Sequence, residues 1–209
     1  MAMIKDSSVD TFLGELASSA ATPGGGSAAA IMGGMGAALV SMVCNLTIGK
    51  KAYAEVEGDM TELLAQAEAL RATLTDFIRA DVEAFDGLMA AYGMAKDTDE
   101  QKAARSAAIQ SSLKNATDAP MACARACAQV IALSLVAAEK GNRNVVSDAG
   151  VAALAAQAAL RSAALNVDIN VPSIKDADFA ASRRTEIDAL LARWVAEADR
   201  VVDVVRSKL

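Results

Sequence analysis

The triple glycine near the N-terminus is the first feature with residue types suited to binding a ligand. It opens a stretch, residues 16–49, that contains no charged side chain. Consecutive glycines add nothing to a core and lose much backbone entropy, so they suit a place where the backbone must pass close to another group. A glycine turn that leads into a helix presents unpaired N–H groups and the positive end of the helix dipole. We therefore predict a binding loop here, although a tight connection between two helices would explain the same glycines. Its residues are Pro23, Gly24, Gly25, Gly26 and Ser27.

Polar and cationic residues gather at the other end of the same uncharged stretch. Lysines near the last turn of a helix interact favourably with the negative end of its dipole, which alone would account for two of these residues. An amide and a hydroxyl beside two ammonium groups would equally suit an anionic ligand. Both interpretations stay open. The residues are Asn45, Thr47, Lys50 and Lys51.

Asp81 is the carboxylate that the hydrophobic pattern places closest to a buried helix face. It follows Phe77 by four residues and precedes Phe85 by four, which puts it beside an apolar stripe. A carboxylate at the edge of a core is unfavourable unless it is paired or functional. An ion pair with Arg79, or with a lysine from elsewhere in the chain, is the structural alternative to a catalytic role.

A second polar turn follows Gly141. Asn, Ser and Asp are frequent in turns because they hydrogen-bond to the nearby backbone. So many polar side chains in one short turn exceed what a helix cap requires, and we predict a binding role here too. These residues are Asn142, Asn144, Ser147 and Asp148.

The composition excludes several kinds of active site. The 209 residues include no histidine, which excludes a Ser-His-Asp triad, a Cys-His pair and a histidine-ligated zinc. Proton transfer must then use a carboxylate, lysine, tyrosine, cysteine or water. A net charge of −6 argues against nucleic acid as a partner. The 3 cysteines and the lack of an apolar leader predict free thiols and a cytoplasmic protein.

The elements that must position these residues are predicted to be helices. Hydrophobic residues make up 54%, much of it alanine, and aromatic residues only 3%, which favours closely packed helices. We expect a single all-α domain over residues 1–209, a bundle of six or seven helices with long central helices. The segment 27–48 is long enough to span a bilayer, but its Ala, Gly and Ser favour a core helix, and no membrane partner is expected. The expected helices span about 8–19, 27–48, 55–92, 98–115, 120–140, 147–165 and 176–206, with a short extended segment at 166–171.

Six short motifs together resemble the cyclodeaminase/cyclohydrolase family. This family comprises the C-terminal domain of formiminotransferase-cyclodeaminase and its free-standing relatives. Each motif is weak alone, but six in register over about residues 8–170 are specific. They are Pro23–Ser27, Met42–Thr47 with Lys50, Lys51 and Tyr53, Asp81–Phe85, Ala91-Tyr92, Gly141–Asn144 with Ser147 and Asp148, and Asn166–Asn170.

The resemblance implies an all-helical homodimer that binds a tetrahydrofolate and acts on the one-carbon unit between its N5 and N10 atoms. One reaction of the family closes 5-formimino-tetrahydrofolate to the 5,10-methenyl form and releases ammonia. The other interconverts 5,10-methenyl- and 10-formyl-tetrahydrofolate with water. Because these residues hold no formiminotransferase domain to supply a formimino substrate, we expect the cyclohydrolase. The cyclodeaminase and a non-catalytic folate-binding module are the alternatives.

The resemblance also assigns expected roles to the residues singled out above. A carboxylate, Asp81, would hold the amidinium cation and take a proton from water, and Lys51 would exchange the proton that moves with N5. Asp148 would complete the proton relay or hold the pterin. No metal or cofactor is expected. The expected substrate-binding residues are Pro23, Gly24, Gly25, Gly26, Ser27, Asn45, Thr47, Lys50, Asn142, Asn144 and Ser147.

Overall fold

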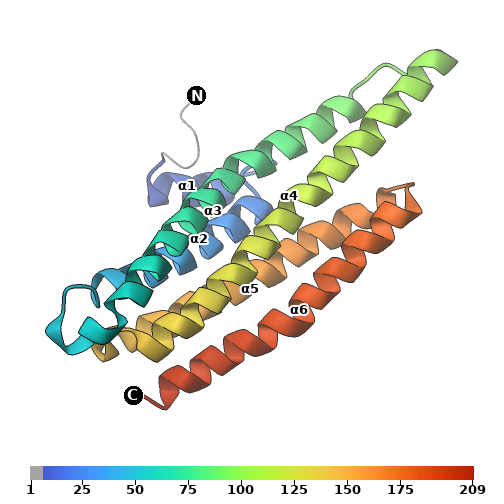
Figure 1. Cartoon of the computed structure of the whole chain (residues 1–209). Helices are drawn as coiled ribbons and strands as arrows, with labels where there is room; N and C mark the ends of the chain where they lie inside the picture. The colour runs from blue at the N-terminus through green and yellow to red at the C-terminus, as the bar shows by residue number, and fades with distance from the viewer. Residues whose placement is uncertain (1–6) are drawn as a thin grey trace.

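The computed structural model describes residues 7–209, and this part of the chain contains six α-helices and no strand (Figure 1). The all-α prediction is confirmed. The helices are α1 (Val9–Leu16), α2 (Gly25–Asn45), α3 (Glu57–Tyr92), α4 (Asp99–Lys140), α5 (Val146–Asn170) and α6 (Ala177–Arg206). Short 3-10 turns lie at η2 (Lys51–Val56), η3 (Arg143–Val145) and η4 (Val171–Ser173).

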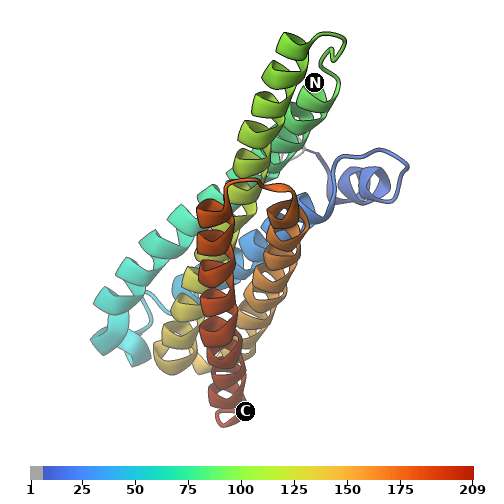
Figure 2. The ribbon, with the colours of Figure 1, turned by 90° about the vertical axis from the view of Figure 1, so that its right-hand side faces the viewer.

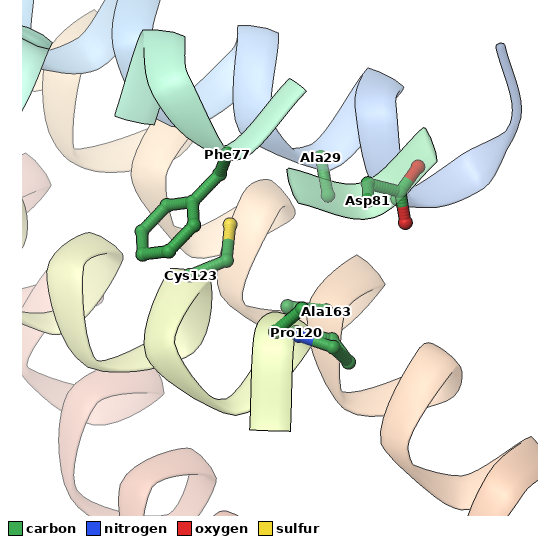
Figure 3. Close-up of a pocket in the computed structure, with 8 residues that line it drawn as sticks. Ala29, Phe77, Asp81, Pro120, Cys123 and Ala163 are labelled. Atoms are coloured by element: carbon green, nitrogen blue, oxygen red, sulfur yellow. The ribbon is translucent and has the colours of Figure 1, made fainter. Parts of the chain in front are cut away.

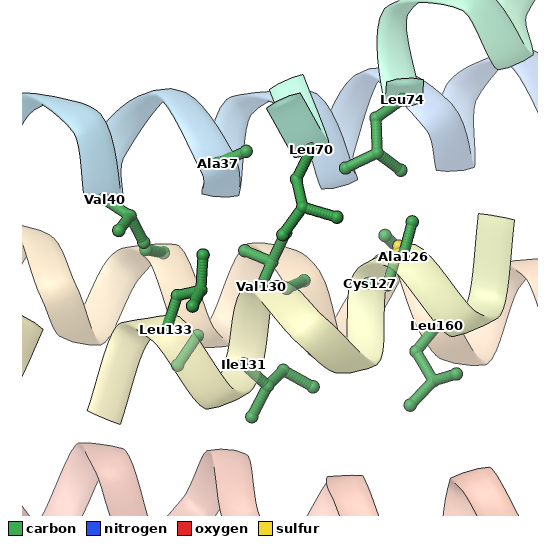
Figure 4. Packing of buried hydrophobic residues seen from close by; sticks show 14 of the residues in the cluster. Ala37, Val40, Leu70, Leu74, Ala126, Cys127, Val130, Ile131, Leu133 and Leu160 are labelled. Carbon is green, nitrogen blue, oxygen red and sulfur yellow. The ribbon is translucent and has the colours of Figure 1, made fainter. Parts of the chain in front are cut away.

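The core lies between α2, α3, α4 and α5, and α6 packs on the outside of α4 and α5. Leucines and valines of α3 and α4 meet alanine-rich faces of α2 and α5 (Figure 4). Small residues let these two helices approach closely: a Cβ on Gly36 of α2 would lie 2.9 Å from the carbonyl oxygen of Ala152 on α5. The far halves of α3 and α4 project from the bundle as a hairpin (Figure 2).

The expected break between two helices at 115–120 is wrong, because α4 runs without interruption from Asp99 to Lys140 through Pro120. Proline within a helix removes one N–H donor and so leaves a carbonyl four residues earlier without its usual partner. Here that carbonyl belongs to Ala116, and it accepts a hydrogen bond of 2.9 Å from Nδ2 of Asn170. A side chain from α5 therefore replaces the missing backbone bond.

The expected extended segment at 166–171 is also wrong. α5 continues to Asn170 and passes directly into η4. The alternation of polar and apolar residues that suggested a strand also contains a helical spacing, since Val167 and Val171 are both buried and four residues apart. At the other end α5 begins at Val146, so Ser147 lies inside its first turn and does not cap it.

Two helix ends follow the sequence signals more closely. Thr98 caps α4 in a reciprocal arrangement: its Oγ1 accepts from the N–H of Gln101, and Oε1 of Gln101 accepts from the N–H of Thr98. α1 begins after Ser8, whose Oγ accepts from the N–H of Thr11. The helix expected over about 8–19 therefore starts within one residue of the observed start and ends earlier, at Leu16.

Two helices, α2 and α4, are long and apolar enough to cross a bilayer by length and composition alone. In the most apolar windows of these helices, 56% of the residues of α2 and 61% of those of α4 are buried inside the protein. Their position at the centre of the bundle accounts for their apolar character.

Candidate functional site

Asp81 on α3 lies directly against the first turn of α2. Its Oδ2 accepts a hydrogen bond of 2.9 Å from Oγ of the buried Ser27. A Cβ on Gly26 would lie only 2.0 Å from Oδ1 of Asp81, so the carboxylate occupies the space that any other residue at position 26 would need. The triple glycine and Asp81 were predicted separately from the sequence, and the structure brings them into contact.

Burial controls the ionisation of this carboxyl group. Loss of hydration raises the pKa of Asp81 above its ordinary value of 3.8, and the hydrogen bonds from the side chain and backbone of Ser27 oppose that rise without cancelling it. No cation pairs with Asp81 within residues 7–209, and Arg79 instead pairs with the exposed Glu83. The ion pair considered as the structural explanation of Asp81 is therefore absent from this part of the chain.

A cleft of about 300 Å³ opens beside Asp81, and we call it the Asp81 cleft. The start of α2, the last third of α3 and the middle of α4 form its walls, and the end of α5 closes it. Asp81 is the only ionisable side chain among the described residues that line it. An apolar recess continues inward past Asp81 toward Phe77 and Cys123 (Figure 3). The lining residues are Ala21, Thr22, Gly24, Gly25, Gly26, Asp81, Ala84, Phe85, Leu88, Ala116, Ala119, Pro120, Asn166, Ile169 and Asn170.

The amides of Asn166 and Asn170 are the main neutral polar side chains of this cleft. Nδ2 of Asn166 donates to the carbonyl oxygen of Ser162, and Nδ2 of Asn170 donates to the carbonyl oxygens of Ala116 and Asn166. These bonds fix both amides and use only their nitrogens, so their oxygens are left as acceptors. Asn166 also approaches the glycine turn, with Nδ2 3.8 Å from the place of a Cβ on Gly25.

The second predicted turn forms a buried hydrogen-bond network around Thr47 and Asn142, which we call the Thr47–Asn142 network. Oγ1 of Thr47 donates to the carbonyl oxygen of Val43 and accepts from the N–H of Asn142. Nδ2 of Asn142 donates to the carbonyl oxygen of Leu46, and its Oδ1 accepts from the N–H of Asn144 and, at 3.4 Å, from the hydroxyl of Tyr53. Thr47 and Asn142 are 1% and 2% exposed, and their side chains bond the end of α2 to the turn before α5. This arrangement is structural and leaves neither side chain free for a ligand.

The remaining predicted residues of this end surround the network at the surface. Lys50, Lys51, Asn45, Asn144 and Ser147 are exposed, and Asp148 is half-buried in the first turn of α5. Pro23, at the opposite end, is buried in the connection before α2 and does not line the Asp81 cleft.

Within one chain the two groups of predicted residues lie far apart. Gly26 is in the first turn of α2, and Asp81 of α3 lies against it, whereas Thr47 and the two lysines follow the end of α2. The 21 residues of α2 separate the two groups by about 30 Å. The structure therefore places Asp81 with Gly24–Ser27, but does not place Lys51 or Asp148 near Asp81 in the same chain.

The sequence matches the formiminotransferase-cyclodeaminase family over residues 8–189. The chain belongs to the formiminotransferase-cyclodeaminase family. It is 58% identical to the methenyltetrahydrofolate cyclohydrolase of Methylorubrum extorquens, over 99% of this chain and 100% of that protein. It is 36% identical to the formimidoyltransferase-cyclodeaminase of Sus scrofa over 95% of this chain, which spans only 37% of that longer protein.

The fold of this family member also resembles a solved structure. The crystal structure of formiminotetrahydrofolate cyclodeaminase from Thermotoga maritima superposes with a TM-score of 0.87, at 30% identity and 98% coverage of both chains. The resemblance predicted from the six motifs is therefore confirmed, and the helical bundle is the fold that the family shares.

Sequence reasoning missed several residues of the Asp81 cleft. Phe85 belongs to the apolar stripe of α3 and to the Asp81–Phe85 motif, and Pro120 is the expected start of a helix, but neither is predicted to line a site. Asn166 and Asn170 belong to one of the family motifs, but we expected them in an extended segment. Their spacing of four residues was the available signal, because residues four apart share one face of a helix.

Proposed function

We propose that this chain is a methenyltetrahydrofolate cyclohydrolase, which interconverts 5,10-methenyl- and 10-formyl-tetrahydrofolate with water. The observation that carries the proposal is a lone, partly desolvated carboxylate in an otherwise neutral cleft. The 5,10-methenyl group is a planar amidinium cation, and a single anion among apolar walls suits a delocalised positive charge. The 58% identity to a cyclohydrolase over its full length supports the same assignment.

The proposed chemistry begins with water addition to the bridging carbon. Ionised Asp81 stabilises the cation and takes one proton from the attacking water as the new C–O bond forms. The bond from this carbon to N5 then breaks, N5 receives a proton, and the hydroxyl loses its proton as the formyl C=O forms on N10. In sum, methenyl cation and water give 10-formyl product and one proton. The oxygens of Asn166 and Asn170 are suited to accept hydrogen bonds from the amino-amide edge of the pterin.

A cyclodeaminase is the second candidate, because the fold is shared with the Thermotoga maritima cyclodeaminase. The two activities are separated by offering purified protein both folates. Loss of the methenyl absorbance on addition of water identifies the cyclohydrolase. Release of ammonia from 5-formimino-tetrahydrofolate without methenyl hydrolysis would contradict it and favour the cyclodeaminase. Binding of both folates with turnover of neither would favour a non-catalytic binding module.

We propose that the protein forms a homodimer whose subunits meet across α2 and α5. Large apolar side chains are exposed on both helices, among them Met35 at 58%, Val151 at 51% and Leu154 at 47%. α2 and α5 pack side by side and run antiparallel, since the end of α5 lies at the start of α2. A second copy is a suitable cover for this face because it would bury the apolar side chains of both chains at once.

Such a dimer would join the two separated groups of residues. A two-fold axis perpendicular to α2 sets the start of that helix in one chain beside its end in the other. The Asp81 cleft of one subunit would then face Lys50, Lys51 and Asp148 of its partner. This arrangement gives the proton partner that the cleft lacks within one chain, and it keeps the predicted roles of Lys51 and Asp148.

Mixing two inactive variants tests the shared site. We expect Asp81→Asn and Lys51→Ala each to be inactive alone. After the subunits are exchanged, half of the dimers are mixed, and each mixed dimer has one intact site, so about a quarter of the wild-type activity should return. No recovery after exchange, verified by tagged subunits in the same dimer, would contradict a site that two chains share.

No group of three or more Cys, Asp or Glu side chains in residues 7–209 is arranged to hold a metal ion. We propose that catalysis needs only the residues of the chain and water, and that the protein acts in the cytoplasm with a folate as its partner, without binding nucleic acid or membrane.

A further inference from the structure

α1 is the one α-helix in the described part of the chain that does not pack into the bundle. It makes few contacts with any other helix of its own chain, and it stands clear of the bundle as the blue helix at the right of Figure 2. Residues 17–24 connect it to the start of α2, and we call residues 7–24 the α1 arm. A helix of 8 residues is too short to be stable alone in water, so it needs a surface to pack on.

The apolar stripe of α1 is only half covered. Val9, Phe12, Leu13 and Leu16 share one face of the helix, because they are three and four residues apart. Phe12 is buried and Leu16 is half-buried, but Val9 is 76% exposed and Leu13 is 55% exposed. Exposed apolar side chains that continue a buried stripe indicate a contact with another molecule.

A groove of about 430 Å³ lies between the second half of α2 and the first half of α3, and we call it the α2–α3 groove. Its α2 side is apolar, with Ala38 and Leu46 exposed and Met42 half-buried. On the α3 side, the guanidinium of Arg71 pairs with Glu68 and forms a polar rim. An apolar strip with a polar rim is typical of contacts between proteins. The lining residues are Ala38, Ser41, Met42, Asn45, Leu46, Glu68 and Arg71.

The proposed dimer brings the α1 arm of one subunit to the α2–α3 groove of the other. Its two-fold axis lies in the interface at right angles to α2, so the start of α2 in one subunit lies beside the end of α2 in the other. The same axis keeps α3 of both subunits on one side of the interface. α1 lies on the α3 side of α2 (Figure 1) and projects away from the bundle (Figure 2), so it extends toward the groove of the partner.

The arm and the end of α2 carry opposite charges. Residues 7–24 contain two carboxylates, Asp10 and Glu15, and no cation. Lys50 and Lys51, which are exposed beyond the end of α2, form no ion pair within the described part of the chain. Opposite charges on facing surfaces favour association and fix its orientation. The occupant that best fits the groove is therefore the arm of a second copy of this chain.

We propose that the α1 arm of each subunit docks in the α2–α3 groove of its partner and so fixes one wall of its own Asp81 cleft. Ala21, Thr22 and Gly24 belong to the arm and line that cleft, so the position of the arm determines the shape of this wall. Docking covers the exposed side chains of Val9 and Leu13 with the apolar side of the groove. This docking rests on the proposed dimer and goes beyond it, because it makes a wall of the cleft depend on the partner's surface.

Cross-linking between chains tests the docked position. Chains with Leu13→Cys and differently tagged chains with Met42→Cys exchange subunits and are then treated with a short bis-maleimide. We expect a covalent heterodimer from this mixture and none from wild type, whose three cysteines are all buried. In the matched control, Leu165→Cys on the exposed face of α5 replaces Met42→Cys and should give no link, because α5 lies on the other side of α2.

Leu13→Asp tests the effect of docking on the cleft. A carboxylate on the apolar stripe weakens docking, so we expect KM for 5,10-methenyl-tetrahydrofolate to rise about fivefold or more, with a smaller change in kcat. Gly14→Asp adds the same charge outside the stripe, where nothing lies within 4 Å of a new Cβ, and should leave KM unchanged.

The outcomes separate the arm from the proposed function. A monomer in sedimentation analysis, no link with Met42→Cys, or a link with Leu165→Cys in its place would overturn docking in this groove, and the hydrolysis assay would still decide on the cyclohydrolase. A covalent heterodimer whose KM is unchanged by Leu13→Asp would overturn the effect on the cleft wall. If wild type hydrolyses no methenyl folate, the cyclohydrolase fails, and the cross-link still decides where the arm binds.

Discussion

The two ends of α2 carry similar sequence signals but differ in how their polar groups are used. At the start, glycines and Asp81 border open space, and the carboxylate retains a raised pKa with Ser27 as its hydrogen-bond donor. At the end, Thr47 and Asn142 use their polar side-chain atoms inside the protein and are almost fully buried. A polar turn next to a glycine is therefore insufficient to predict a ligand site. An incompletely satisfied charge beside a cavity is the better indicator.

The largest expected difference between the two ends comes from Asp81→Asn. The amide keeps the shape and can still accept from Ser27, but it neither neutralises the cation nor takes a proton. We expect kcat/KM to fall by about 10²-fold to 10⁴-fold. The melting temperature should stay near that of wild type, because the substitution also removes a charge that burial disfavours.

The matched control is Asp86→Asn, which removes an exposed carboxylate from the same helix and should change neither property. A strongly lowered melting temperature of the Asp81 variant, with activity reduced only in proportion to unfolding, would assign Asp81 to the capping of α2 instead.

Gly26→Ala tests whether the close contact with the carboxylate matters. The new methyl group would lie 2.0 Å from the present position of Oδ1, so Asp81 must move, and kcat/KM should fall more than about tenfold. Gly24→Ala is the matched control. Its new methyl group would meet nothing closer than the backbone oxygen of Ala21 at 3.6 Å, and alanine readily adopts the φ of −131° found at this position. Equal activities of the two alanine variants would show that the glycine turn has no effect on the position of the carboxylate.

The sequence predicts the helices of this molecule better than the contacts between them. Helical periodicity located nearly every helix, because it depends on neighbours three and four residues apart. It failed at Pro120 and at 166–171 because the deciding contact, from Asn170 to the carbonyl of Ala116, joins two helices that are distant in sequence. The same limit applies to the site. Residue types indicated Asp81 and the glycines, but only the fold shows that Lys51 lies at the other end of α2.

Asn142→Ala and Asn166→Ala should separate the two ends by stability. Truncating the almost fully buried Asn142 leaves the carbonyl of Leu46 and the N–H of Asn144 without their partner, and we expect a loss of about 1–3 kcal/mol in unfolding free energy. Truncating Asn166 at the half-buried cleft wall should cost less and should instead raise KM. Chemical denaturation together with steady-state kinetics measures both. A destabilised Asn166 variant with unchanged KM, beside a stable Asn142 variant with raised KM, would reverse the assignment of the two ends.

The smallest expected effect concerns the acid limb of the pH profile. A carboxylate that acts as a base must be ionised, so kcat/KM should fall as pH drops through the pKa of Asp81, which lies above 3.8. The hydrogen bonds from Ser27 stabilise the ionised form, and Ser27→Ala removes the one from its side chain, so the pKa and the acid limb should move to higher pH. The free energy of unfolding depends on pH in the opposite direction. Because the pKa of Asp81 is raised in the folded state, this group stabilises the fold below its unfolded pKa, and the contribution is lost as pH rises through the folded pKa. Ser41→Ala, the same substitution farther along α2, should leave the limb in place. An acid limb that Ser27→Ala leaves unmoved, or moves to lower pH, would mean that a group other than Asp81 controls it.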